Sequence, residues 1–108
     1  MTREQLQEIR WLEPWEAATA GLEAELVREV SGGHPLHNVK AISVGRRTDS
    51  DDVLFFLPEH SQPLVVVHLT WTKEFSAKWP WAVFYSSVDD WVNRCMKPDH
   101  DEYKSNVD

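Results

Sequence analysis

Hydrophobic side chains recur at helical spacing through the first thirty residues of the chain. A capping box at residues 2–5 (TREQ) precedes apolar positions that return every third residue up to Leu12. Pro14 ends or kinks this helix, or begins a second one, and the apolar stripe then continues from residue 15 to residue 30. The sequence Ser-Gly-Gly at 31–33 is a strong C-terminal stop. The pattern therefore predicts an N-terminal helical segment.

The middle of the chain changes to short apolar runs separated by polar turns. Residues 39–47 alternate loosely, residues 53–57 are almost entirely apolar, and residues 64–69 contain three consecutive valines, which favour a strand. The polar clusters at 49–52 and 58–63 are short enough to join antiparallel neighbours. Three antiparallel strands are predicted here.

The last third of the chain predicts an irregular stretch followed by a helix. Residues 71–81 show no regular period, after which residues 82–85 can add a fourth short strand. Ser87 is typical of a helix N-cap because acidic residues follow it in the first turn, and Pro98 is expected to end the helix. The polar residues 99–108 are expected to form a frayed tail.

The predicted element order, α-β-β-β-(β)-α, defines an α+β fold. We expect an antiparallel sheet of three to four strands with an N-terminal helical segment and a C-terminal helix. The helices are expected to cover one face of the sheet. A length of 108 residues suits one domain that spans residues 1–108.

Charge narrows the range of partners. The chain carries 18 acidic and 11 basic residues, a net charge of −7. This balance disfavours nucleic acid and anionic membranes, because both attract lysine and arginine and repel carboxylates. It suits a basic protein partner, or it serves solubility alone.

Cysteine content and hydropathy predict the compartment. Cys95 is alone, so no internal disulfide can form and an oxidising compartment is not implied. The first ten residues are charged and polar where a signal peptide would be apolar, and no apolar run approaches the length of a membrane span. We therefore expect a cytoplasmic protein.

Four side chains could act as ligands of a zinc ion: His34, His37, Cys95 and His100. Their spacing does not favour a site, because Pro35 prevents a helical arrangement of the first two histidines and neither CxxC nor HExxH is present. Cys95 lies on the apolar face of its predicted helix, where a thiol behaves as a small hydrophobic group. We predict neither a bound metal nor a cofactor.

The sequence contains no recognisable arrangement of residues for nucleophilic or acid–base catalysis. Cys95 falls near the C-terminal end of its helix, where the helix dipole raises a thiol pKa. The aspartates at 49–52 lie in a turn and those at 89–90 in a helix cap, so both groups already have a structural role. No catalytic residues are assigned, and the chain is predicted not to be an enzyme.

The segment from residue 71 to residue 81 combines tryptophans with lysines. Trp71 and Trp81 can pack on the strands that they flank, whereas Trp79 follows Lys78 in a polar stretch and is expected to be partly exposed. Exposed aromatic side chains with lysines, including Lys73, indicate a protein-binding surface, a sugar platform or a single-strand stacking surface. The net charge argues against the last, and a loop folded onto the sheet remains the simpler alternative.

His68 is the histidine best placed to face a ligand. Strand alternation puts Val65, Val67 and Leu69 on one face and His68 on the other, together with Val66. If this second face borders solvent or a groove, His68 faces a ligand. A core histidine satisfied by one hydrogen bond is the competing interpretation.

Several strings in the sequence resemble segments of a group of small, uncharacterised bacterial proteins. The strings are GHPLH (33–37), DDVLFFL (51–57), VVVHLTW (65–71) and DDWVNRCMKPDHDEY (89–103). The resemblance spans residues 20–103 and implies a bacterial, cytosolic setting. It carries no activity, cofactor or site over to this chain.

These observations favour a small acidic protein-binding module without catalytic activity. An immunity or inhibitor-type partner of a basic protein, such as a toxin or nuclease, would have these properties. The predicted binding residues are Trp79, Trp81, Lys78, Lys73 and His68. The alternative is a small hydrolase or metal-dependent enzyme built on His34, His37, His68 and His100. A subunit that works only within an oligomer, such as a homodimer, is a third hypothesis.

Overall fold

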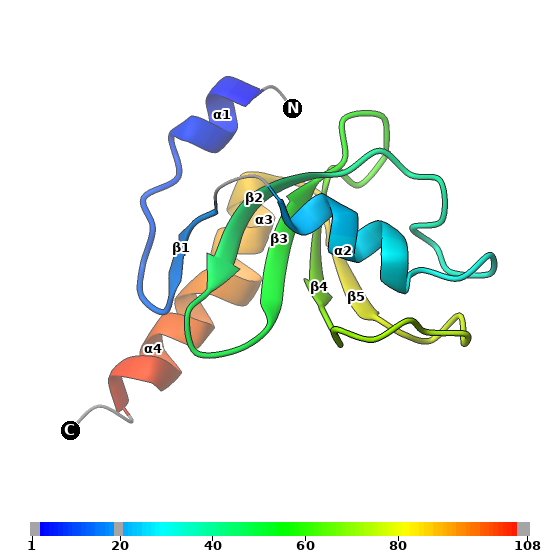
Figure 1. The fold of residues 1–108 in the computed structure, drawn as a ribbon. Coiled ribbons are helices and arrows are strands. Elements are labelled where there is room, and N and C mark those ends of the chain that lie inside the picture. The colour runs from blue at the N-terminus through cyan, green and yellow to red at the C-terminus, as the bar shows by residue number, and fades with distance from the viewer. Residues whose placement is uncertain (1–2, 19–20, 106–108) are drawn as a thin grey trace.

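The computed structural model describes residues 3–18 and 21–105, and its centre is a five-stranded antiparallel sheet (Figure 1). Each strand pairs with the next one along the chain, so the sheet is a simple meander. The strands are β1 (Trp15–Ala17), β2 (Ile42–Arg47), β3 (Asp52–Phe56), β4 (Leu64–His68) and β5 (Trp81–Tyr85). The α+β class is confirmed, and the sheet has one strand more than the three to four predicted.

Helices lie on both faces of this sheet. The helix α2 (Leu22–Glu29) crosses one face, and a continuous helix of residues 88–105 crosses the other (Figure 1). The second helix consists of α3 (Val88–Trp91), a π-helical turn η1 (Val92–Met96) and α4 (Lys97–Ser105). A short helix, α1 (Arg3–Gln7), precedes the sheet. The expectation that the helices cover one face is therefore wrong.

The apolar runs in β3 and β4 explain why both faces are covered. Residues 53–56 and 64–67 are all buried, so successive side chains on opposite faces each need an apolar neighbour. Leu54 and Val66 pack with Trp91 of the C-terminal helix. Their neighbours Phe55 and Val65 pack with the α2 side of the molecule. The sheet thus separates two apolar cores.

The N-terminal helical segment is interrupted by a strand that the sequence pattern does not reveal. Residues 15–17 form β1, in which Trp15 pairs with Arg47 of β2. The Trp15 side chain is buried and packs edge-on against Trp91, with ring centroids 5.2 Å apart. A long-range aromatic contact therefore overrides the local helical spacing around Pro14.

The C-terminal helix continues through Pro98 to Ser105, so the predictions that Pro98 ends it and that a frayed tail begins at residue 99 are wrong for residues 99–105. Lys97 N–H donates to Val92 O, five residues back, as expected of a π-helical turn. This wider turn relieves the clash that a proline ring makes with the carbonyl four residues before it. Residues 106–108 of the predicted tail lie outside the described residues.

A half-buried acid, Glu23, joins α2 to the sheet. Glu23 Oε1 accepts hydrogen bonds from Ser43 N–H and Ser43 Oγ, both at 2.8 Å, and Glu23 Oε2 accepts one from Gly21 N–H at 3.0 Å. Burial raises the pKa of Glu23, but these hydrogen bonds outweigh it and lower the pKa to about 2.

No helix within the described residues is long and apolar enough to cross a membrane.

Candidate binding surface

Exposed aromatic side chains gather on the connection between β4 and β5. We call residues 70–80 the aromatic loop; it is the yellow-green connection at the lower right of Figure 1. Within the described residues, five large hydrophobic side chains are exposed, and four of them lie on residues 71–81. The exposed fractions are 49% for Trp71, 84% for Phe75, 47% for Trp79 and 63% for Trp81, which begins β5. Exposed apolar side chains concentrated in one segment are typical of interaction surfaces, which makes this loop the candidate site.

Trp71 and Trp81 could have packed on the strands that they flank, but both are exposed. The partial exposure of Trp79 agrees with its polar neighbours in the sequence. Phe75, the most exposed of the four, was not singled out by sequence. Its position between Glu74 and Ser76, in a stretch without period, was the signal that could have identified it.

Glu29 anchors the beginning of the aromatic loop. It lies in the last turn of α2 and is fully buried. Its Oε1 accepts hydrogen bonds from Thr70 N–H at 2.7 Å and Thr70 Oγ1 at 3.0 Å, and its Oε2 accepts one from Trp71 N–H at 2.8 Å. Burial and the neighbouring Glu25 raise the pKa of Glu29, and the bonds from Thr70 and Trp71 oppose this rise.

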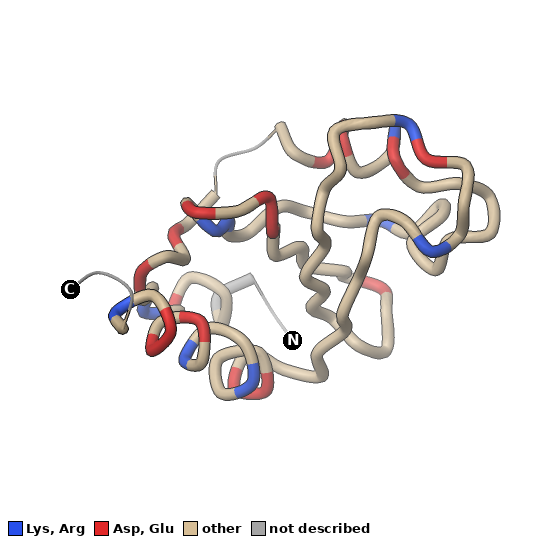
Figure 2. Tube along the Cα trace, turned by 90° about the horizontal axis from the view of Figure 1, so that it is seen from below, with Lys and Arg blue, Asp and Glu red and all other residues tan. Residues whose placement is uncertain are grey.

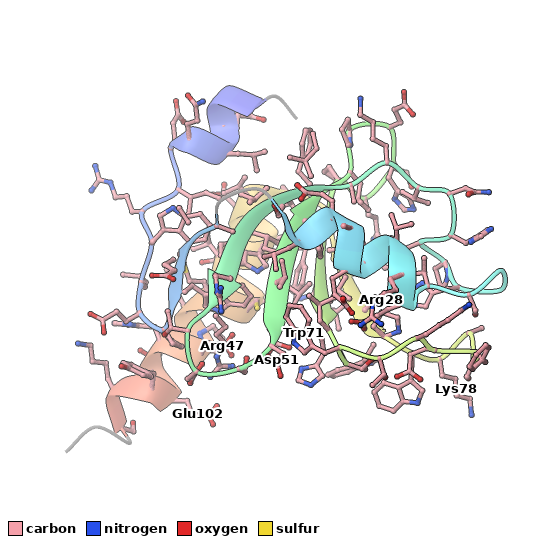
Figure 3. The ribbon with its side chains drawn as sticks, viewed as in Figure 1. Arg28, Arg47, Asp51, Trp71, Lys78 and Glu102 are labelled. Atoms are coloured by element: carbon pink, nitrogen blue, oxygen red, sulfur yellow. The ribbon has the colours of Figure 1, made fainter. Side chains whose placement is uncertain are left out.

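Trp71 is held in a backbone conformation that bulky residues seldom adopt. Its φ is 60°, in the left-handed region, which costs of order 1–3 kcal/mol and persists only where the surroundings enforce it. Glu29 fixes its amide, and its indole N–H donates to Asp51 Oδ1 at 3.1 Å (Figure 3). The Trp71 ring is therefore presented at the surface in a defined position.

His34 anchors the end of the aromatic loop. Its Nδ1 accepts a hydrogen bond from Leu36 N–H at 3.0 Å, so the proton is on Nε2, which donates to Pro80 O at 2.7 Å. Next to it, Gly33 approaches Ala77 so closely that an added Cβ would lie 3.3 Å from the Ala77 side chain. The loop is thus fixed at both ends and in the middle.

The two predicted lysines flank the exposed rings. Lys73 Nζ lies 5.7 Å from the centroid of the Phe75 ring, within the range of a cation–π contact. Lys78 is exposed on the part of the loop that returns to β5 (Figure 3). Lys73 is therefore next to the Phe75 ring in space, and Lys78 is next to Trp79 in the sequence.

A small polar pocket adjoins the aromatic loop where β4 ends and β5 begins. Antiparallel pairing places His68 opposite both Asp52 and Trp81, and His68 Nδ1 lies 2.7 Å from Asp52 Oδ1. These three residues continue the face that carries Leu54 and Val66 and line a pocket of about 180 Å³. The alternation predicted for β4 is confirmed, and the His68 side chain is 43% exposed, bonded to a carboxylate rather than to a backbone carbonyl.

The C-terminal helix forms the opposite wall of this pocket. Asp99 accepts hydrogen bonds from Trp15 Nε1 at 2.8 Å and Cys95 Sγ at 3.5 Å, and Arg47 Nη1 lies 3.4 Å from it. Burial, reinforced by Asp99, raises the pKa of the Cys95 thiol to about 12. The thiol is therefore protonated at neutral pH and is a poor nucleophile. Burial also raises the pKa of the Tyr85 hydroxyl.

Asp52 was missed by sequence reasoning, which assigned it to a solvated turn. It is the first residue of β3, and its partner His68 is the last of β4. The signal was the register of the hairpin, because counting outward from the turn at 58–63 pairs these two positions.

The histidines do not share a site. His34 bonds to Pro80, His68 bonds to Asp52, and His100 Nδ1 lies 2.7 Å from Glu13 O, while His37 is exposed. Across residues 3–18 and 21–105, no group of three or more His, Cys, Asp or Glu side chains could hold a metal ion. Figure 2 shows acidic and basic positions interspersed along the trace rather than separated onto two faces.

No family model matches the sequence, no curated protein is similar to it, and no solved structure matches it.

Proposed function

We propose that this chain is a small acidic protein-binding module that binds a basic protein through its aromatic loop, as an immunity or inhibitor-type partner would. The observation that carries the proposal is the concentration of exposed aromatic side chains on residues 71–81. Tryptophan and other large side chains supply most of the energy at protein interfaces, because they bury large areas while few rotamers are lost.

The fixed geometry of the aromatic loop supports this role. Glu29 and His34 hold its two ends through hydrogen bonds of 2.7 to 3.0 Å. A loop that is already ordered loses little conformational entropy when it binds, so more of the contact energy appears as affinity.

The charge supports a basic protein as the partner. With a net charge of −7, the chain attracts a basic surface and repels the phosphates of nucleic acids. The two lysines of the loop lie among the aromatic rings and add specificity at the contact itself.

A hydrolase is the second candidate, and the Asp52–His68 pair is the observation in its favour. A carboxylate at 2.7 Å orients the imidazole as it does for a general base. However, the neighbouring Cys95 and Tyr85 are held protonated, so the described part of the pocket offers the base no ready nucleophile. Binding therefore remains the better-supported function.

Site-specific photocrosslinking tests the proposal in cells that contain the chain naturally. We would place p-benzoylphenylalanine at position 75 on the loop and, as a control, at position 27, since Val27 is the exposed hydrophobic side chain of α2. We expect one prominent adduct from position 75 that mass spectrometry identifies as a basic protein, and no such adduct from position 27.

The identified partner is then purified and titrated. Phe75→Ala and Trp79→Ala should each weaken binding by about tenfold or more, whereas Val27→Ala should change it by less than about twofold. All three variants should melt close to the wild type, because Val27 and Phe75 are largely exposed and Trp79 is about half exposed. An adduct with a second copy of the chain, a non-protein adduct, or no adduct specific to position 75 would overturn the proposal.

A further inference from the structure

We infer that the pocket formed by Asp52, His68 and Trp81 binds an arginine side chain of the partner. The inference rests on the proposed function and names one contact of the complex. The pocket of about 180 Å³ is smaller than the roughly 300–1,000 Å³ of sites that enclose a drug-sized ligand or cofactor. It suits a single inserted side chain.

The free atoms of the Asp52–His68 pair accept hydrogen bonds. An ionised carboxylate only accepts, so the proton shared with Asp52 Oδ1 belongs to His68 Nδ1. In a neutral imidazole, Nε2 then carries a lone pair. Within the described chain, neither His68 Nε2 nor Asp52 Oδ2 has a hydrogen-bond partner. A ligand that satisfies both must be a donor of at least two hydrogen bonds.

Both arginines that line the pocket are already paired with acids. Arg47 is neutralised by Asp49 at 2.7 Å and by Asp99 at 3.4 Å, and Arg94 by Asp90 at 3.1 Å. The ionised residues that line the pocket are Arg47, Arg94, Asp52 and Asp99, so their charges cancel when His68 is neutral. Asp52 is near enough to Arg47 to act on its charge, but within the described residues it forms no ion pair with a lysine or arginine, and its contact is with His68.

Trp81 makes arginine a better occupant than lysine. It lies directly across from His68 on the neighbouring strand, so the two side chains stand next to each other on one face of the sheet. A planar guanidinium can donate to the carboxylate and the imidazole while it stacks on an indole ring, which a compact ammonium group cannot do as well. A partner arginine would thus bind at Trp81, the residue that follows the aromatic loop.

The probe for this site is N-acetylarginine amide, titrated into the isotope-labelled chain at pH 8. We expect saturable NMR shifts of the Trp81 indole N–H and the His68 ring, with a dissociation constant of about 1–10 mM for so small a ligand. N-acetylcitrulline amide has the same shape without the charge and should bind at least about tenfold more weakly. N-acetyllysine amide should be intermediate.

Single substitutions test which residues bind the arginine probe. Asp52→Asn and Trp81→Leu should each weaken binding of the arginine probe by about tenfold or more. Asp101→Asn, an exposed carboxylate on α4, should leave it unchanged. Trp81 is exposed and should tolerate substitution if Asp52→Asn fails to fold, and the comparison with citrulline needs no variant.

The outcome separates this inference from the proposed function. Equal shifts with arginine and citrulline probes, shifts elsewhere, or no shifts would overturn the arginine pocket even if position 75 crosslinks to a basic protein. Specific binding of the arginine probe without any protein adduct from position 75 would instead overturn the proposed function. If Trp81→Leu leaves the affinity for the identified partner unchanged, the pocket lies outside the interface and the arginine inference is overturned, while the proposed function stands.

Discussion

Glu29 and His34 are the two buried polar side chains within the described part of the chain, and both bond to the aromatic loop. Buried polar groups are costly unless their hydrogen bonds are satisfied. Here the bonds go to the backbone of Thr70, Trp71 and Pro80 in the loop. The core thus determines where the exposed tryptophans lie.

Replacing Glu29 should uncouple the loop from the core. In Glu29→Gln an amide N–H₂ would replace one carboxylate oxygen, so one of the donors from Thr70 and Trp71 would face another donor. We expect a loss of about 1–3 kcal/mol in the free energy of unfolding by urea titration. Glu59→Gln, in an exposed turn, is the control and should change little. Equal stability of wild type and Glu29→Gln would show that the loop does not depend on this carboxylate.

Sequence reasoning at this scale predicted the partial exposure of Trp79 and the face of β4 that carries His68, but it did not predict the burial of Glu29. Glu29 lies off the apolar stripe of its helix, which indicates a solvated side chain, yet it is buried because Thr70 and Trp71 come to it from far along the chain. Local spacing does not encode such contacts. The pairing of Asp52 with His68 was accessible in principle, because it follows from the register of one hairpin.

At the scale of elements, the apolar runs of β3 and β4 were predicted because their composition alone requires burial. The strand β1 was not predicted, because three residues after a proline are too few to show a periodic apolar pattern. The contact of Trp15 with Trp91 fixes them instead. The continuation of the last helix past Pro98 was also missed. A proline usually ends a helix, but here the π-helical turn before it accommodates the ring.

The segment α4 should therefore contribute to stability. A chain truncated after Pro98 lacks Asp99, which leaves the Trp15 indole N–H without an acceptor and removes one ion pair of Arg47. We expect the free energy of unfolding to fall by at least about 2 kcal/mol, with a melting temperature lower by more than about 8 °C. Truncation after Lys104 keeps these contacts and should cost less than about 1 kcal/mol. A melting temperature unaffected by the longer truncation would show that the helix end does not hold the sheet.

At the scale of the whole molecule, the candidate site lies at one end of the sheet. Figure 3 shows Arg47, Asp51 and Trp71 along the end where β3 begins and β4 finishes, with Lys78 farther out on the loop. One apolar core lies on each face of the sheet, so this end of the sheet is supported from both faces. The C-terminal helix contributes the pocket wall, and α2 with residues 33–38 supports the aromatic loop. One binding surface can therefore use rigid support from both layers.

The excess of acidic over basic residues should act on the rate of association rather than on the lifetime of the complex. Charges dispersed over the molecule steer a basic partner at long range, and salt screens them as the Debye length falls from about 30 Å at 0.01 M to about 8 Å at 0.15 M. Stopped-flow measurements with the identified partner should show association slowed by about tenfold over this range and dissociation changed by less than about twofold. Trp79→Ala is the complementary variant, because it removes contact area without charge. It should speed dissociation and leave the salt dependence of association intact. A salt effect confined to dissociation would place the acidic residues inside the contact and would contradict a steering role.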